Sequence, residues 1–177
     1  MQGMTRKWET PPATDPTRPL LARILEARGL KDRESLRSFL DPKLSALEDP
    51  SELPGAVEAG KILCEALRAD KKVLIYGDYD ADGITASAVL FHIIAAATGK
   101  EGPAVYIPNR IEEGYGINVG AIEKFADQGI DVVVSVDCGV TAIEAAKRAK
   151  ELDITLIVTD HHKPREDGEL PDCDVIV

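Results

Sequence analysis

The chain has 177 residues, a length that suits one domain or one domain with a small extension. Hydrophobic residues make up 44% and charged residues 29%, which excludes a disordered or collagen-like chain. The formal net charge is −10, so a basic surface spread over the whole molecule is excluded, whereas a local basic patch is not.

The first part of the chain is predicted to be helical. Residues 1–19 are rich in proline, threonine and charge, which is typical of a loose arm. Apolar residues at helical spacing predict three helices, over residues 18–28, 33–40 and 56–69. A linker with two prolines occupies residues 43–54. We therefore expect an N-terminal region of arm and helices over residues 1–54 and a second domain over residues 55–177.

Beyond the third helix, short apolar runs alternate with helical segments. The apolar runs predict five strands, at residues 73–76, 104–107, 132–136, 154–158 and 175–177. Helices are predicted at residues 84–98, 118–127 and 141–152, the last two capped by Asn118 and Thr141. Alternating strands and helices form right-handed βαβ units. The predicted fold class is therefore α/β, a doubly wound parallel sheet of about five strands preceded by a small helical N-terminal region.

Polar side chains follow four of these strands, where such sheets bind ligands. The first strand is followed by Asp78, Asp80 and Asp82, and the second by Asn109 and Arg110. The third is followed by Asp137, and the fourth by Asp160, His161, His162 and Lys163. Because the carboxyl ends of parallel strands meet at one edge, we expect these side chains to converge there.

The residue types at this edge indicate metal chemistry. Crowded aspartates repel one another, so such a cluster binds protons or a cation. Carboxylates mixed with imidazoles favour Mn²⁺ or a related first-row metal, and more than four ligands indicate two ions. Arg110 and Lys163 can hold phosphate oxygens. The predicted reaction class is the metal-assisted hydrolysis of a phosphate ester.

Three motifs resemble those of the DHH phosphoesterase superfamily: Asp78-Tyr-Asp-Ala-Asp-Gly83, Asp137-Cys-Gly139 and Asp160-His-His162. The segment with Pro108-Asn109-Arg110 and Glu113-Gly-Tyr-Gly116 resembles the RecJ-type single-stranded-DNA-specific exonucleases within it. The resemblance runs from about residue 71 to the end. It implies an enzyme that uses two Mn²⁺ or Mg²⁺ ions and degrades single-stranded DNA from the 5′ end in recombination and repair.

The resemblance also implies roles for single residues. Four match metal ligands, with Asp137 as the bridging one: Asp78, Asp80, Asp137 and His161. Three match catalytic or supporting positions: Asp82, Asp160 and His162. The expected substrate-binding residues are Asn109 and Arg110, from the motif, and Lys163, from its charge.

The family pattern continues beyond the last of these motifs. It includes a further metal-binding aspartate and a second domain, DHHA1, and Asp172 and Asp174 come too early to be that aspartate. We therefore expect a C-terminally incomplete fragment, and whether it is active alone is left open. The expected partner is single-stranded DNA, joined in the full-length protein by a helicase or a single-strand-binding protein.

No membrane segment is expected. Residues 1–20 contain no apolar core, and the longest apolar stretch, near residues 86–97, is too short to span a bilayer. The three cysteines lie far apart and form no CxxC pair, which suits reduced thiols. We expect a cytoplasmic protein.

Four other functions are weighed against this one. A DHH-family phosphodiesterase could act on short oligonucleotides or cyclic dinucleotides. A receiver domain would use Asp137 as its phosphoacceptor, but it has no place for two histidines after the fourth strand. A haloacid-dehalogenase-like phosphatase would use Asp78 as its nucleophile, although Ala81-Asp82 stand where Gly-Thr is usual. The fourth is an inactive homologue that acts as a scaffold.

Overall fold

The computed structural model describes residues 15–177 of the chain. Close contacts divide the chain into two compact units, with the boundary between Glu48 and Asp49. The loose arm predicted over residues 1–19 lies mostly outside the described residues.

The first unit contains two of the predicted helices. They are α1 (Leu20–Ala27) and α2 (Arg33–Leu40), and the bounds of α2 are those predicted. The carboxylate of Asp32 accepts a hydrogen bond from the backbone N–H of Ser35 at 2.8 Å and so caps α2.

The predicted linker contains two short 3-10 turns, η2 (Leu44–Ala46) and η3 (Pro50–Glu52). η3 packs against α3 (Ala56–Arg68), so the second compact unit begins ahead of the domain boundary expected after residue 54. The assignment of two domains stays a prediction.

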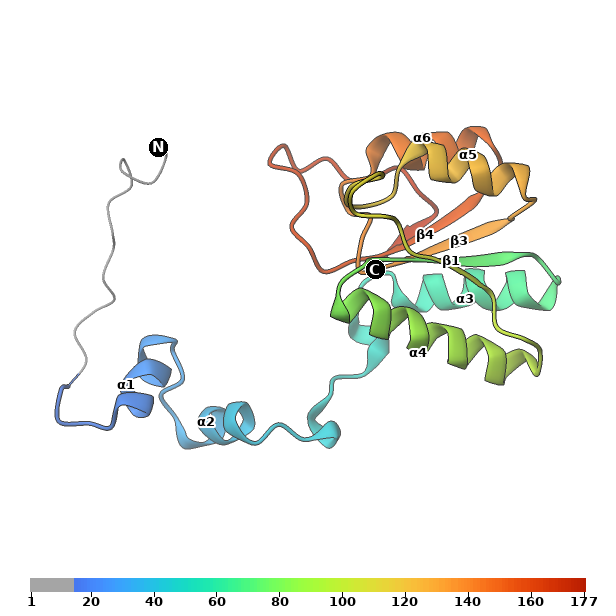
Figure 1. Ribbon diagram of the computed structural model, residues 1–177. Coiled ribbons are helices and arrows are strands. Elements are labelled where there is room, and N and C mark those ends of the chain that lie inside the picture. Colours follow the sequence, from blue (N-terminus) through green and yellow to red (C-terminus); the bar gives the residue numbers. More distant parts are fainter. Residues whose placement is uncertain (1–14) are drawn as a thin grey trace, which may run out of the picture. The chain divides into compact units, whose positions relative to one another are not determined.

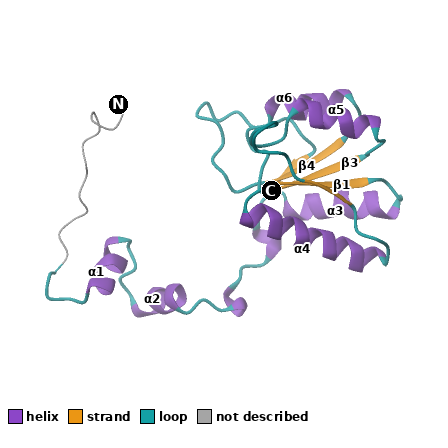
Figure 2. Cartoon of the chain, in the orientation of Figure 1, coloured by secondary structure: helices purple, strands orange, loops and turns teal. Residues whose placement is uncertain are grey.

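The second unit is a three-layer α/β fold, shown in Figures 1 and 2. Its five strands are β1 (Val73–Gly77), β2 (Ala104–Tyr106), β3 (Val132–Val136), β4 (Thr155–Thr159) and β5 (Val175–Ile176). All neighbouring strands are parallel, in the order β2-β1-β3-β4-β5. One face is covered by α3 and α4 (Ala81–Thr98), and the other by α5 (Val119–Asp127) and α6 (Ile143–Glu151). The predicted doubly wound sheet is confirmed.

The strands present apolar side chains to both layers of helices. Tyr76 and Val133 pack in the cluster with α5 and α6, whereas Val134 and Ile157 pack in the cluster with α3. Burial of each such side chain contributes roughly 1.5–3 kcal/mol relative to exposure. Because both faces are covered, the strands are continuous apolar runs rather than alternating ones.

The register of the central strands aligns their carboxyl ends. Gly77 of β1 is level with Val136 of β3, and Val136 is level with Thr159 of β4. The next residue of each strand therefore leaves the sheet beside its neighbours, which brings together Asp78, Asp137 and Asp160.

The starts of α4 and α6 differ from the prediction. α4 begins earlier than expected because the carboxylate of Asp80 accepts a hydrogen bond from the N–H of Gly83 at 3.1 Å and caps the helix there. The predicted Thr141 cap is wrong, since α6 has Ala142 at its N-cap and no side-chain capping bond. The predicted Asn118 cap of α5 is confirmed.

Within residues 15–177, the single helix that is long and apolar enough to cross a membrane by length and composition is α4. The core helix of a soluble protein passes the same test; α4 packs against β1 and β3 along one face that includes the buried Ser87 and Ile94, and 17% of the helix is buried. This helix is therefore weak evidence for a span, and the expectation of no membrane segment stays a prediction.

The start of α3 and the end of the sheet meet in the second unit. Gly55, at the N-cap of α3, has a φ of +79°, and a Cβ there would lie 2.0 Å from the carbonyl oxygen of Ile176. On the side of β4, the N–H of Asp160 donates to the carbonyl oxygen of Val177 at 3.1 Å. The segment of β5 and Val177 therefore contacts both the start of α3 and the end of β4.

Replacement of the α5 cap tests this description of the helix starts. Asn118 Oδ1 accepts a hydrogen bond from Ala121 N at 2.8 Å, so Asn118→Ala is expected to lower the free energy of unfolding by about 1 kcal/mol. Thr141→Ala, the matched control at the uncapped start of α6, is expected to change it by less than about 0.5 kcal/mol. Urea denaturation followed by circular dichroism measures both, and equal losses would contradict the assignment.

Candidate metal centre

Three aspartates from three adjacent strands lie at the carboxyl edge of the sheet. Asp78 is 2% exposed and Asp137 is 8% exposed, and the side chain of Asp160 is 1% exposed. Burial of an ionised carboxylate is costly unless hydrogen bonds or opposite charges compensate it. The surroundings of each carboxylate therefore indicate what it does.

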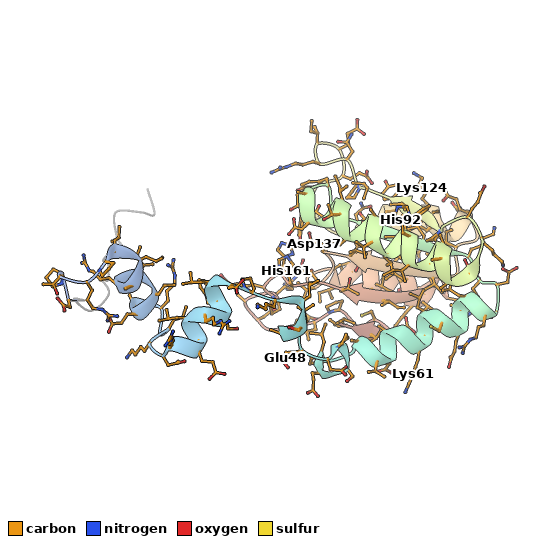
Figure 3. All side chains as sticks on the ribbon, turned by 90° about the horizontal axis from the view of Figure 1, so that it is seen from below. Glu48, Lys61, His92, Lys124, Asp137 and His161 are labelled. Carbon is orange, nitrogen blue, oxygen red and sulfur yellow. The ribbon has the colours of Figure 1, made fainter. Side chains whose placement is uncertain are left out.

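In the part of the chain that the structure describes, two groups of side chains have donor atoms close enough to hold a cation. One consists of Asp78, Asp80 and Asp137, and the other of Asp137, His161 and His162; within each group the donor atoms lie within 4.8 Å of one another. Figure 3 shows Asp137 and His161 next to each other at this edge. Asp137 belongs to both groups, so its carboxylate is common to the two donor sets.

Asp137 is held in an unusual conformation with one oxygen unpartnered. Its φ is +64°, Oδ1 lies 2.9 Å from His161 Nε2, and Oδ2 is buried with no hydrogen-bond partner among residues 15–177. Burial raises the pKa of Asp137, and the negative charges of Asp82 and Asp80 raise it further, against the opposite effect of His161 and His162. A divalent cation fits this site, because it would satisfy Oδ2 and offset the repulsion between the carboxylates.

Asp160 is fully engaged in hydrogen bonds and so serves a different purpose. Its Oδ2 accepts from Val140 N at 2.8 Å, and its Oδ1 lies 2.8 Å from His162 Nδ1 and accepts from the His162 backbone N–H at 3.0 Å. Burial raises the pKa of Asp160, but these hydrogen bonds outweigh burial and hold the pKa below its ordinary value. Asp160 therefore orients the imidazole of His162.

His162 is polarised by this carboxylate. The network assigns the proton to Nδ1, which leaves Nε2 directed away from Asp160. The hydrogen bond to Asp160 raises the pKa of His162, and the charges of Asp160 and Asp137 add to the effect.

The start of α4 supplies the remaining acidic side chains. Asp80 is the N-cap, and the hydrogen bond from Gly83 N lowers the pKa of its carboxyl group. Asp82 lies in the first turn, exposed, with Oδ2 at 3.8 Å from His161 Nε2. A Cβ at Gly83 would lie 2.7 Å from Asp78 Cβ, so the glycine lets α4 start directly over the end of β1.

An open cleft of about 400 Å³ adjoins these side chains. Its lining includes the polar groups of Asp82, Asp137 and His161 together with the apolar side chains of Leu53 and Ala86. The polar groups thus face a space that a substrate can enter.

Comparison with known proteins settles the family. Residues 72–177 match the model of the DHH family, N-terminal domain. The chain belongs to the DHH family. It is 41% identical over 159 residues to the single-stranded-DNA-specific exonuclease RecJ of Bacillus subtilis, with 90% of this chain and 20% of that protein covered. It is 37% identical over 150 residues to the RecJ protein of Thermus thermophilus, with 85% of this chain and 20% of that protein covered.

Solved structures of RecJ proteins show the same likeness. A crystal structure of exonuclease RecJ bound to manganese superposes with a TM-score of 0.63 at 38% identity, over 71% of this chain and 31% of that chain. RecJ from Thermus thermophilus in complex with Mn²⁺ gives a TM-score of 0.62 at 31% identity, over 86% of this chain and 20% of that chain. The chain thus spans only part of the RecJ proteins that it matches.

The three predicted substrate-binding residues of this DHH chain lie on loops near the site. The guanidinium of Arg110 lies 5.1 Å from the ring centre of Tyr79, which follows Asp78 directly. Asn109 Oδ1 accepts from Ile111 N at 3.0 Å, so that oxygen is used within its own loop. Lys163 is exposed and follows the last histidine of the DHH motif. Their substrate contacts stay predictions.

Tyr115 is a site residue whose contacts the sequence did not reveal. Its hydroxyl lies 3.0 Å from His162 Nδ1 and 3.4 Å from the carbonyl oxygen of Asp137, to which it donates. Burial raises the pKa of Tyr115. The flanking Gly114 and Gly116 have φ values of +81° and +84°. In the sequence, the feature that could have indicated the role of Tyr115 is its position between these two glycines.

Glu113 anchors the loop that carries Tyr115 and Arg110. Its carboxylate accepts hydrogen bonds from the hydroxyl of Tyr106 at 2.5 Å and from the N–H of Asn109 at 2.8 Å. The hydrogen bond from Tyr106 lowers the pKa of Glu113. Because Tyr106 and Asn109 lie outside the Glu113–Gly116 motif, the motif alone did not reveal these two hydrogen bonds.

The two aspartates near the C-terminus have other partners. Asp172 forms an ion pair with Lys150, and Asp174 Oδ2 accepts a hydrogen bond from Leu156 N at 2.8 Å. Neither belongs to the two donor groups.

The pairing of Asp160 with His162 predicts a pH dependence. Because the folded-state pKa of His162 is raised, the pair stabilises the fold fully below the unfolded value of about 6.5, and this contribution is lost as the pH rises through the raised pKa. Asp160→Asn removes the negative charge but keeps an acceptor for Val140, so we expect it to lower the pKa of His162.

Two-dimensional NMR of the imidazole nitrogens in metal-free protein measures this titration. The control is Asp172→Asn, which removes an exposed charge paired with Lys150 and is expected to leave the titration of His162 where it is. An unchanged pKa of His162 in Asp160→Asn would show that Asp160 does not polarise the ring.

Proposed function

We propose that the chain belongs to a metal-dependent exonuclease that hydrolyses phosphodiester bonds of single-stranded DNA from the 5′ end. The observation that carries the proposal is the buried carboxylate of Asp137, shared by two donor groups and left with an unpartnered oxygen. The likeness to RecJ proteins, named as single-stranded-DNA-specific exonucleases, supports the substrate class. Because the chain spans 20% to 26% of the length of the first two curated relatives, the activity of the whole protein is part of the proposal.

The proposed metal ligands are the four predicted from the motifs, Asp78, Asp80, Asp137 and His161, and the proposed ions are two Mn²⁺ or Mg²⁺. Two solved relatives are described as bound to manganese, which supports a divalent cation. When bound, such ions lower the pKa of a coordinated water and offset the negative charge of the reacting phosphate.

The other side chains of the site have roles in orientation and proton transfer. Asp160 accepts the Nδ1 proton of His162 and raises the pKa of the ring, so the imidazolium form, protonated at both nitrogens, can give its Nε2 proton to the leaving oxygen of the scissile phosphate and remain as the neutral Nδ1–H imidazole. Asp82 supports His161 from the first turn of α4. The planar guanidinium of Arg110 can donate hydrogen bonds to two phosphate oxygens while it remains stacked near the ring of Tyr79.

The alternatives from other families lose their support. Membership of the DHH family leaves no independent reason for a receiver domain or a haloacid-dehalogenase-like phosphatase. A DHH-family phosphodiesterase for short oligonucleotides or cyclic dinucleotides is the second candidate, because it would use the same carboxylates and histidines.

The wider context is also proposed. We propose that the protein acts in DNA recombination and repair in the cytoplasm, with a helicase or a single-strand-binding protein as partners of the full-length enzyme. These assignments rest on the likeness to RecJ proteins.

Metal binding by this chain tests the core of the proposal. Titration with Mn²⁺, followed by electron paramagnetic resonance, is expected to show specific binding. Asp137→Ala is expected to weaken it by more than about 100-fold, beyond the loss typical of an outer-shell partner. The control is Asp127→Ala, which removes an exposed acid at the end of α5. No specific binding, or equal affinity in the two variants, would contradict the metal centre.

Hydrolysis assays separate the two candidate substrates. The chain with Mn²⁺ is given 5′-labelled single-stranded DNA or a cyclic dinucleotide, and chelation by EDTA is expected to abolish turnover of either. Release of labelled mononucleotides from the long strand supports the exonuclease. Faster turnover of the cyclic dinucleotide would favour the second candidate.

A further inference from the structure

Ser135 is a polar side chain in an otherwise apolar strand. It is 0% exposed, and the remaining residues of β3 are all valines. A buried hydroxyl without a partner costs about 1–3 kcal/mol, so its presence in the core calls for a specific bond. Neither donor group of the metal centre contains Ser135.

The hydroxyl of Ser135 bonds to the turn that follows the strand. Its Oγ donates to the carbonyl oxygen of Cys138 at 2.7 Å. The carbonyl oxygen of Ser135 in turn accepts a hydrogen bond from Thr159 Oγ1 at 2.7 Å. The Ser135 hydroxyl therefore connects the end of β3 to the turn that holds Asp137, and the Thr159 hydroxyl connects the end of β4 to β3.

This turn is conformationally demanding. Asp137 has a φ of +64° and Gly139 a φ of +121°, and a Cβ at Gly139 would lie 3.0 Å from Ser135 Oγ. A left-handed conformation costs an L-residue roughly 1–2 kcal/mol, and it persists only where the surroundings enforce it. The N–H of Asp137 continues the ladder by donating to the carbonyl oxygen of Thr159 at 2.9 Å, and the Tyr115 hydroxyl donates to the carbonyl oxygen of Asp137 at 3.4 Å. Neither bond holds the next peptide, between Cys138 and Gly139.

Rotation of the Cys138–Gly139 peptide would change the turn that carries the Asp137 carboxylate. Cys138 is 1% exposed, and its carbonyl oxygen would lose the hydroxyl partner described above. We propose that Ser135 is a positioning residue, whose hydroxyl holds the Asp137–Gly139 turn in the conformation that directs the Asp137 carboxylate at both donor groups. The expected effect of Ser135 on metal affinity rests on the proposed function, whereas its effect on the conformation of the turn does not.

The test compares two substitutions in β3. Ser135→Ala removes the hydroxyl, and Val134→Ala, the control, removes buried methyl groups that pack in the cluster with α3. In the Mn²⁺ titration, Ser135→Ala is expected to weaken binding by about 10- to 100-fold. Val134→Ala is expected to lower thermal stability without changing the affinity of the folded protein. Equal affinities in Ser135→Ala and the unsubstituted chain would overturn the proposal.

A second readout needs no metal. Amide hydrogen exchange is measured at Asp137 and at Val140, whose N–H donates to Asp160, and is compared with exchange at Val158 in β4. Ser135→Ala is expected to speed exchange at the two turn amides relative to Val158, whereas Val134→Ala changes all three together. Unchanged relative exchange in Ser135→Ala would also overturn the proposal.

Failure of the unsubstituted chain to bind Mn²⁺ and failure of Ser135→Ala to fold can each be distinguished from failure of the positioning role. If the unsubstituted chain binds no Mn²⁺, the proposed function fails, and hydrogen exchange alone decides the role of Ser135. If Ser135→Ala does not fold, Ser135→Cys replaces it, because the thiol fills similar space and is a much weaker donor. Faster relative exchange at Asp137 and Val140 in Ser135→Cys supports the positioning role, and unchanged exchange rejects it.

Discussion

The parallel ladder of β1, β3 and β4 places the ends of three strands level with one another, about 4.8 Å apart. Asp78, Asp137 and Asp160 follow those ends, so the ladder forces three carboxylates into one buried neighbourhood. Their mutual repulsion is a consequence of sheet geometry, and the surrounding structure must compensate it. Most of the polar contacts at this edge can be understood as that compensation.

The carboxylates of Asp160 and Asp137 are compensated to different extents, and this difference indicates that they have different roles. Asp160 receives two backbone N–H groups and the imidazole of His162, so it is a satisfied structural anion. Asp137 keeps a buried oxygen without a partner, in a backbone conformation that costs free energy. Unsatisfied groups and strain are expected where a site is organised for a ligand rather than for stability alone.

The features predicted from the sequence are those that depend on short stretches of chain. The apolar runs predicted the five strands, and Asn118 predicted the start of α5, because both signals are local. The convergence of the motif residues followed from parallel topology. The hydroxyl of Tyr115 on His162 and the carboxylate of Glu113 on Tyr106 could not be predicted, because each joins residues that are distant in sequence or depends on the path of a loop.

The contact of β5 with Gly55 and Asp160 has a consequence for the order of assembly. The backbone of Asp160 is fixed in part by Val177, and the start of α3 packs against the carbonyl of Ile176. Closure of such long loops is entropically unfavourable until the intervening structure has formed. During synthesis, β1, β3 and β4 can therefore associate first, and the bond from the Asp160 backbone to Val177 is added when β5 has left the ribosome and joined the sheet.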